Sequence, residues 1–179
     1  LDLNQVEDAL EAGKAGFVLP VHLYGNPCPM DELMALAEKY GATVLEDNAQ
    51  SIGASYKGKY TGTFGRAGGI SFYPAKNLGC FGQGGAITTN DPDVAAHARM
   101  LINQGEGGER YYHEGVGYNG RLDSLQARVL DILLDRVDSF NAGRLQAADW
   151  YAARLDPDRL QVRTEGATPV YHLFEYRCD

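Results

Sequence analysis

Hydrophobic and polar positions recur along this chain with two different periods, and these periods predict its helices and strands. Apolar residues at helical spacing predict helices over residues 1–15, 30–40, 92–102, 122–137 and 145–155. Short apolar runs predict strands over residues 17–23, 43–47, 68–72 and 85–89, and alternation predicts a half-buried strand over residues 170–176. A small exposed hairpin is predicted over residues 56–60. The mixture of helices and strands indicates an α/β protein.

The first two predicted strands and the helix between them place one carboxylate at a sheet edge. A strand, a helix and a strand within about 30 residues predict a βαβ unit with parallel strands. Asp47 then lies at the carboxyl end of the second strand, the edge where open α/β sheets bind ligands. The alternative is that Asp47 caps the turn of residues 48–50, and the pattern leaves both interpretations open.

A single lysine stands in a turn between two predicted strands, just before a glycine-rich run at residues 79–85. Four apolar residues flank Lys76 in sequence: Phe72, Tyr73, Leu78 and Phe81. We therefore expect its ammonium group to lie against apolar surface, which lowers the pKa of a lysine and frees the amine to attack a carbonyl. An ordinary solvated lysine is the alternative, and this stretch alone does not decide between them.

Two other segments carry expectations of their own. Residues 104–120 form a long polar loop rich in glycine, and loops of this length in compact domains are usually functional or mobile. The predicted strand at residues 170–176 has no partner strand in view, and the chain lacks an initiating methionine. We therefore expect a fragment of a longer protein.

Composition and charge exclude several classes of function. The chain has 179 residues, of which 44% are hydrophobic and 22% charged, as in soluble globular proteins. Its formal net charge of −8 argues against a nucleic-acid or membrane-surface binder, because both need a positive field. The three cysteines are scattered without a C-x-x-C pair, which favours the reducing cytoplasm. No histidine lies at metal-ligand spacing, so no metal site is expected.

Familiar nucleotide-binding and nucleophile motifs do not fit the chain, but one set of residues does carry chemistry. The glycine-rich run matches neither a Walker loop nor a dinucleotide-binding turn, and there is no G-x-S-x-G elbow. Asp47, Gln50, Ser71 and Lys76 are the residue types that a pyridoxal phosphate enzyme needs. A lysine forms the Schiff base, a carboxylate keeps the pyridine nitrogen protonated, and a hydroxyl binds the phosphate.

Segments in the order and spacing of one enzyme family support this interpretation. They are EDNAQ at residues 46–50, SFYPAKNLG at 71–79, GGAITT at 84–89 and GYNGRLDSLQA at 117–127. Together they resemble the DegT/StrS family of sugar aminotransferases, which are fold type I enzymes dependent on pyridoxal 5'-phosphate. The resemblance runs from the first predicted strand to the long helix. It implies that the chain is part of the large domain, a mostly parallel sheet flanked by helices, followed by the start of a small α+β domain.

The resemblance also implies a role for individual residues. Lys76 would hold the cofactor as a Schiff base and shuttle the proton. Asp47 would pair with the pyridine nitrogen, Gln50 would bond the ring oxygen, and Ser71 would bind the phosphate. Asn119 would reach the phosphate of a neighbouring subunit, so a homodimer with shared active sites is expected. For His22 and Arg121, salt bridging or ordinary packing is at least as good an interpretation as a functional one.

The implied reaction moves an amino group, usually from glutamate, to a keto group of a nucleotide-linked sugar. Within the resemblance, residues 121–123 are more like the enzymes that act at the sugar C3 keto group than those that act at C4. Lysine at position 76 also differs from the sugar dehydratase branch of the family, which carries histidine there. The alternatives are a keto-cyclitol or other small ketone as acceptor, or a non-catalytic regulatory relative that binds the cofactor or a sugar nucleotide.

Family members are about twice the length of this chain, which sets the expected domain organisation. Residues 1–140 would be part of the cofactor-binding large domain. Residues 141–179 would be a linking helix and the start of a truncated small domain. The fragment alone is expected to bind cofactor poorly and not to turn over.

Overall fold

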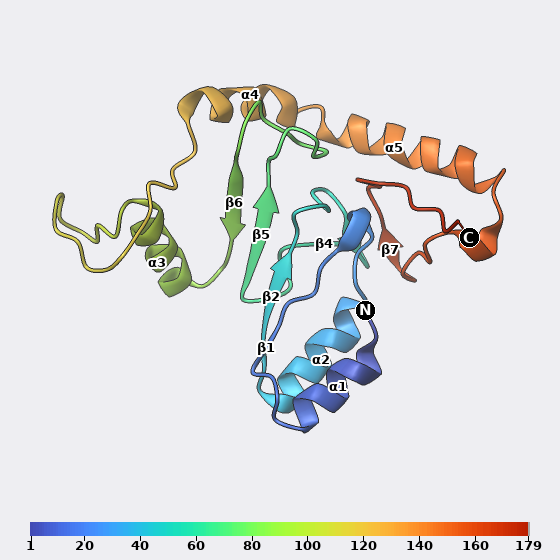
Figure 1. The fold of residues 1–179 in the computed structure, drawn as a ribbon, viewed down its shortest axis with the longest axis horizontal. Helices are drawn as coiled ribbons and strands as arrows, with labels where there is room; N and C mark the ends of the chain where they lie inside the picture. The colour runs from blue at the N-terminus through green and yellow to red at the C-terminus, as the bar shows by residue number, and fades with distance from the viewer. Residues whose placement is uncertain (179) are drawn as a thin grey trace.

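A four-stranded sheet lies at the centre of the chain in this computed structural model, which describes residues 1–178 (Figure 1). Its strands lie side by side in the order β1 (Phe17–Val18), β2 (Thr43–Asp47), β5 (Ala67–Ser71) and β6 (Gly85–Thr88). β1, β2 and β5 are parallel, whereas β6 runs antiparallel to β5. The predicted βαβ unit is confirmed, and so is the mostly parallel α/β sheet.

Two helices near the amino terminus, α1 (Leu3–Glu11) and α2 (Met30–Tyr40), pack beside β1 and β2 (Figure 1). Asp2 caps α1 by accepting hydrogen bonds from the next turn, and Gly41 ends α2 with a left-handed φ of +65°. Beneath them lies the first hydrophobic core, whose buried members are Cys28, Met30, Leu33, Ala37, Val44 and Tyr56. This core fixes the helix-side face of β2.

Three further helices are α3 (Pro92–Ile102), α4 (Ser124–Leu134) and α5 (Val137–Ala152). Asp91 caps α3 and Pro92 occupies its first turn, as the sequence predicted. The single helix expected over residues 122–137 ends at Leu134, and α5 already begins at Val137, eight residues before the predicted position. Because α5 runs through residues 140 and 141, the proposed domain boundary falls inside a helix, and the division into two domains stays a prediction. Asp179, in its second part, lies outside the described residues.

A second, three-stranded sheet joins distant parts of the chain. Its strands have the order β4 (Lys59–Tyr60), β3 (Ser55–Tyr56) and β7 (Ala167–Thr168). The predicted hairpin is confirmed in β3 and β4, but the expectation that it is exposed is wrong for Tyr56, whose exposed fraction is 2%. Tyr56 is buried because β7 pairs with β3 and the first core packs against its ring.

Two predicted strands are shorter or absent. The strand expected over residues 17–23 ends at Val18, because Pro20 lacks an N–H to donate and Tyr24 and Gly25 adopt left-handed backbone angles. The strand expected over residues 170–176 does not form. Tyr171 has a φ of +43°, side chains bind the carbonyl groups of residues 170–172, and Tyr176 forms an isolated bridge with Leu160.

The long loop over residues 104–120 is confirmed as a connection that contains no helix or extended strand. It leaves α3 and returns to α4 well to one side of the sheet, as Figure 1 shows. Between residues 1 and 178, no helix has the length and apolar character needed to cross a membrane.

Candidate active site

The register of β2 against β5 brings two of the predicted residues to one edge of the sheet. Asp47 lies opposite Gly69, and the backbone N–H of Asn48 donates to the Gly69 carbonyl at 2.9 Å. Ser71 follows Gly69 by two residues, so its side chain points to the same face as that of Asp47. A side-chain atom added at Gly69 would meet nothing within 4 Å, so this face is open beside Asp47.

Main-chain bonds on both sides hold Asp47 in place. Its N–H donates to the Pro20 carbonyl at 2.9 Å, and its carbonyl accepts from the His22 N–H at 3.1 Å. Its side-chain Oδ1 accepts from the Ala49 N–H at 3.0 Å, so the capping interpretation is present in the structure. One carboxylate oxygen is sufficient for this cap, and Oδ2 remains available to a ligand on the open face.

Gln50 lies in the turn after Asp47 with its side chain already oriented. Its Oε1 accepts from the Tyr24 N–H at 2.6 Å, which stabilises the left-handed backbone of Tyr24, with a φ of 61°. The carbonyl end of the amide is therefore engaged with the protein. The remaining NH2 group is a donor, as a hydrogen bond to a ring oxygen requires.

The turn that carries Lys76 is closed at its base by backbone hydrogen bonds. Phe72 N–H donates to the Gly84 carbonyl at 2.8 Å, and Cys80 N–H donates back to the Phe72 carbonyl at 2.9 Å. Ser71, which begins this turn, accepts from the Tyr73 N–H through its Oγ at 3.3 Å. Lys76 is half-buried and follows Ser71 by five residues at the same sheet edge.

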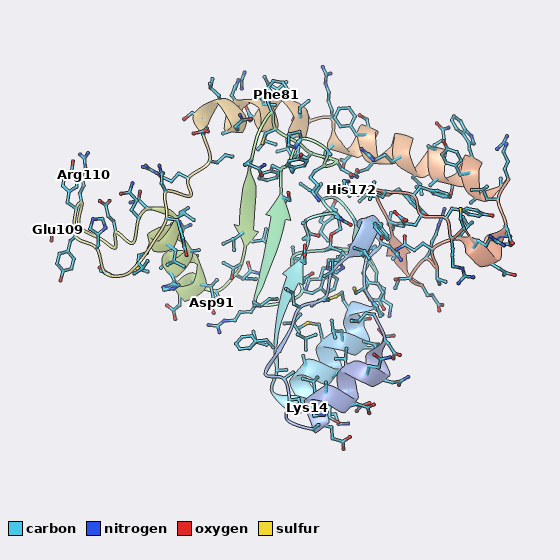
Figure 2. All side chains as sticks on the ribbon, viewed as in Figure 1. Lys14, Phe81, Asp91, Glu109, Arg110 and His172 are labelled. Carbon is cyan, nitrogen blue, oxygen red and sulfur yellow. The ribbon has the colours of Figure 1, made fainter. Side chains whose placement is uncertain are left out.

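The apolar residues that flank Lys76 in sequence differ in burial. Leu78 is buried in a second hydrophobic core with Cys80, but Tyr73 is 47% exposed and Phe81 82% exposed. Phe81 lies at the end of the turn next to α4, with its ring in solvent (Figure 2). The expectation that the ammonium group of Lys76 lies against apolar surface stays a prediction.

Asn119 is not brought to this edge. It is exposed, forms an isolated bridge with Asn103 at the end of α3, and accepts from Arg121 Nη2 at 3.4 Å through its Oδ1. The loop that carries it lies on the far side of β6 from β2 (Figure 1). Its proposed role in a neighbouring subunit stays a prediction, and Arg121 has this hydrogen bond rather than the salt bridge that was one interpretation of it.

A buried His22–Glu46 pair stands directly behind Asp47. Glu46 Oε1 accepts from His22 Nε2 at 3.1 Å and from the Gly62 N–H at 2.7 Å, and Oε2 accepts from the N–H groups of Phe64 and Gly65, both at 2.7 Å. Burial alone would raise the pKa of Glu46, but the bonds from His22, Gly65 and Gly62 outweigh it and lower the pKa. The pair fixes the backbone from which Asp47 projects.

Sequence reasoning left this pair open and missed a second buried group. Asn77, next to Lys76, donates through Nδ2 to Asn141 Oδ1 at 2.7 Å and to the Val170 carbonyl at 3.0 Å. The sequence did contain a signal for the His22–Glu46 pair, because a carboxylate at a buried strand position requires hydrogen-bond partners. No sequence signal connects residue 77 with residues 141 and 170, since they are far apart along the chain.

Two surface hollows lie elsewhere, along α3. Their volumes are about 790 Å³ and 570 Å³, and residues such as His97, Arg99 and Ile102 line them. None of the five predicted site residues lines either hollow. Within residues 1–178, no group of three metal-binding side chains is present.

The sequence matches the DegT/DnrJ/EryC1/StrS aminotransferase family over residues 1–179. The chain belongs to this family. It is 46% identical over 182 residues to the dTDP-3-amino-3,4,6-trideoxy-alpha-D-glucose transaminase of Streptomyces venezuelae, which covers 100% of this chain and 48% of that protein. It is 43% identical over 157 residues to the UDP-N-acetyl-3-dehydro-alpha-D-glucosamine 3-aminotransferase of Acidithiobacillus ferrooxidans, covering 88% of this chain and 42% of that protein.

Solved structures of DegT/DnrJ/EryC1/StrS aminotransferases share the fold. The structure of S. venezuelae DesV in complex with a ketimine intermediate matches with a TM-score of 0.90 and 45% identity, over 97% of this chain and 47% of that chain. The predicted fold class, part of the large domain of a fold type I aminotransferase, is confirmed. The chain spans about half the length of the relatives it matches.

Proposed function

We propose that the whole protein is a pyridoxal-phosphate-dependent aminotransferase that acts on a nucleotide-linked keto sugar. The observation that carries the proposal is the placement of Asp47 and Ser71 on one open face at the carboxyl edge of parallel strands, with Lys76 in the turn that follows. A carboxylate, a hydroxyl and an amine at one such edge are the donor set for this cofactor.

The residues present fit the cofactor. The cofactor, when bound, supplies an electron sink for the carbanion that forms when an amino acid loses its α-proton. Asp47 would hold the pyridine nitrogen through its available oxygen, Gln50 would donate its NH2 to the ring oxygen, and the Ser71 hydroxyl would donate to the phosphate. Lys76 would bind the cofactor covalently and afterwards move a proton with its free amine. The open face at Gly69 leaves room for a flat ring.

The names of the relatives support a sugar as the amino acceptor and C3 as the position. Both curated relatives described above carry an amino or keto group at C3 in their names. We propose glutamate as the donor, a cytoplasmic location, and a homodimer in which Asn119 reaches the partner's cofactor. A keto-cyclitol acceptor and a non-catalytic regulatory role are the outcomes that would replace this proposal.

Covalent trapping on Lys76 tests the proposal. The whole protein is loaded with pyridoxal 5'-phosphate, reduced with borohydride and digested, and the labelled peptide is identified by mass spectrometry. The label is expected on Lys76, to be absent in Lys76→Met and to persist in the control Lys57→Met, which removes an exposed hairpin lysine. A wild-type protein with unmodified Lys76 refutes the proposal.

A second measurement separates the alternatives. Glutamate added to the loaded protein should discharge the bound cofactor in a single turnover, and a nucleotide-linked 3-keto sugar should restore it. If only a keto-cyclitol restores the cofactor, the amino acceptor is a cyclitol rather than a sugar. If glutamate does not discharge the bound cofactor, the protein is a binder rather than an aminotransferase.

A further inference from the structure

Hydrogen bonds join the tip of the turn that carries Lys76 to the rest of the chain through one side chain, that of Asn77. Its Nδ2 donates to Asn141 Oδ1 at 2.7 Å and to the Val170 carbonyl at 3.0 Å. In the part of the chain that the structure describes, no other hydrogen bond links residues 73–78 to a segment outside their own turn. The placement of the lysine therefore depends on what its neighbour Asn77 binds.

Asn141, on α5, connects this tip to the turn that carries Gln50. Its Nδ2 donates to the carbonyl of Ile52, two residues after Gln50, at 3.1 Å. Because a main-chain carbonyl can only accept, Nδ2 of Asn141 must face Ile52, and its Oδ1 must face Asn77. The Val170 carbonyl fixes the orientation of the Asn77 amide in the same way. The two amides therefore form one bridge between the two turns, with a defined donor and acceptor at each contact.

The surroundings of the bridge are fitted to it. Asn141 is buried, and a Cβ at Gly53 would lie 2.6 Å from its Nδ2, so a larger residue there would displace the amide. Gly53 also has a φ of +82°, which favours glycine. Ile52 and Val137 pack against the second hydrophobic core, which contains Leu78. Apolar packing thus joins the same three segments that the two amides connect.

A second route leads from Asn77 to the same turn. Val170, whose carbonyl accepts from Asn77, donates its N–H to the Gly25 carbonyl at 3.0 Å. The residue before Gly25 is Tyr24, and its N–H donates to Gln50 Oε1 at 2.6 Å. Hydrogen bonds therefore run from the lysine turn to the Gln50 turn by two routes, and both begin at the Asn77 amide.

We propose that Asn141 is a positioning residue for Lys76, which it holds through Asn77 at a set distance from the turn of Asp47 and Gln50. Asp47 and Gln50 are the residues proposed to hold the cofactor ring, and the amine of Lys76 has to reach the cofactor held there. A misplacement of about 1 Å can lower the rate of such a step about 100-fold. Neither asparagine acts on the cofactor directly, because the effect passes through the backbone of the lysine turn. The inference rests on the proposed role of Lys76.

Hydrogen exchange in the whole protein without cofactor tests the bridge independently of any activity. Mass spectrometry follows the amides of residues 48–53 and 72–80 in the wild type, Asn141→Leu and the control Leu33→Ala. Leu33 is buried in the first core on α2, which lies far from α5 (Figure 1), so its truncation lowers stability without touching the bridge. Exchange in both turns is expected to be several-fold faster in Asn141→Leu and unchanged in Leu33→Ala. Unchanged exchange in Asn141→Leu, or an equal increase in the control, overturns the inference.

The rate at which the cofactor becomes trappable on Lys76 by borohydride, at saturating cofactor, gives a second readout. Asn141→Leu and Asn77→Leu should each slow trapping several-fold, whereas Leu33→Ala should not. Because both asparagines act through one bridge, the double variant is expected to be no slower than Asn77→Leu alone. Effects that multiply would show that the two residues act independently and would overturn the inference.

Two further outcomes keep the inference separate from folding and from the proposed function. If Asn141→Leu does not fold, Asn141→Ser takes its place, because a serine is too short to join Asn77 to Ile52. Trapping as fast in the Asn141 variant as in the wild type overturns the inference and leaves the proposed function standing. A wild type that is not trapped on Lys76 refutes the proposed function itself.

Discussion

Replacing Glu46 by glutamine tests whether the buried carboxylate behind Asp47 holds the sheet edge together. The carboxylate accepts four hydrogen bonds, two on each oxygen. A glutamine keeps one oxygen and presents an NH2 group in place of the other. Whichever way the amide is turned, the NH2 group faces two N–H groups of the protein and cannot accept from them. His22 cannot compensate, because its Nδ1 accepts from the Cys28 N–H at 3.1 Å and Nε2 must therefore carry the proton.

The expected loss follows from this count. A hydrogen bond to a charged group contributes about 1.5–3 kcal/mol, so losing two should lower the free energy of unfolding by at least about 3 kcal/mol. Urea unfolding of the whole protein, followed by circular dichroism, measures the change. The control Glu7→Gln removes only the negative charge that pairs with an exposed lysine, Lys39, and should lower the free energy of unfolding much less than Glu46→Gln.

The pH dependence gives the same prediction a second test. The pKa of Glu46 in the folded protein lies below its ordinary value of 4.5, so the stabilisation is present above that pH and is lost as the pH falls through the folded pKa. The difference between wild type and Glu46→Gln should therefore narrow in acid. A difference no larger than that of Glu7→Gln, or one that does not change with pH, would refute the reasoning.

Three further substitutions probe other parts of the chain. Gly25→Ala puts a Cβ 2.9 Å from Val170 Cγ2, whereas the control Gly58→Ala has a similar φ but meets nothing within 4 Å. Thermal unfolding should therefore show a loss of stability that is larger by about 1–3 kcal/mol for Gly25→Ala than for Gly58→Ala. Asp47→Asn should weaken cofactor binding by about 1.5–3 kcal/mol, measured by equilibrium dialysis, with unchanged unfolding because an amide oxygen can still cap the turn. Asp91→Ala removes the cap of α3 and should cost about 1 kcal/mol in thermal unfolding; no change there would contradict the capping assignment.

Local patterns were sufficient for the parts of the fold that position Asp47. Three features can be recognised from residues within a single turn or strand: the spacing of apolar residues in α2, the glycine at position 41 and the apolar run of β2. Parallel pairing followed from the length of the connection, and with it the placement of Asp47 at the ligand-binding edge. These features depend on interactions close in sequence, which is why they could be predicted.

Features that depend on distant partners could not be predicted. The alternating run at residues 170–176 has the composition of a strand, but Asn77 and Arg144 bind the carbonyl groups of residues 170–172, and Tyr176 forms only an isolated bridge with Leu160. Phe81 is an aromatic residue of the kind that lines pockets, yet its side chain is exposed to solvent. In both cases the tertiary surroundings, which no local pattern encodes, override the preference of the segment.

The pairing of Asp47 with Gly69 has a consequence for how this site tolerates change. A slip of β5 by one residue along β2 would move the Ser71 side chain to the opposite face of the sheet, and a slip by two would displace it by roughly 6.6 Å. Either shift would separate the carboxylate from the hydroxyl and the lysine by more than side-chain rotation can recover. The geometry of the site therefore depends on the backbone hydrogen bonds that set the register of β2 and β5.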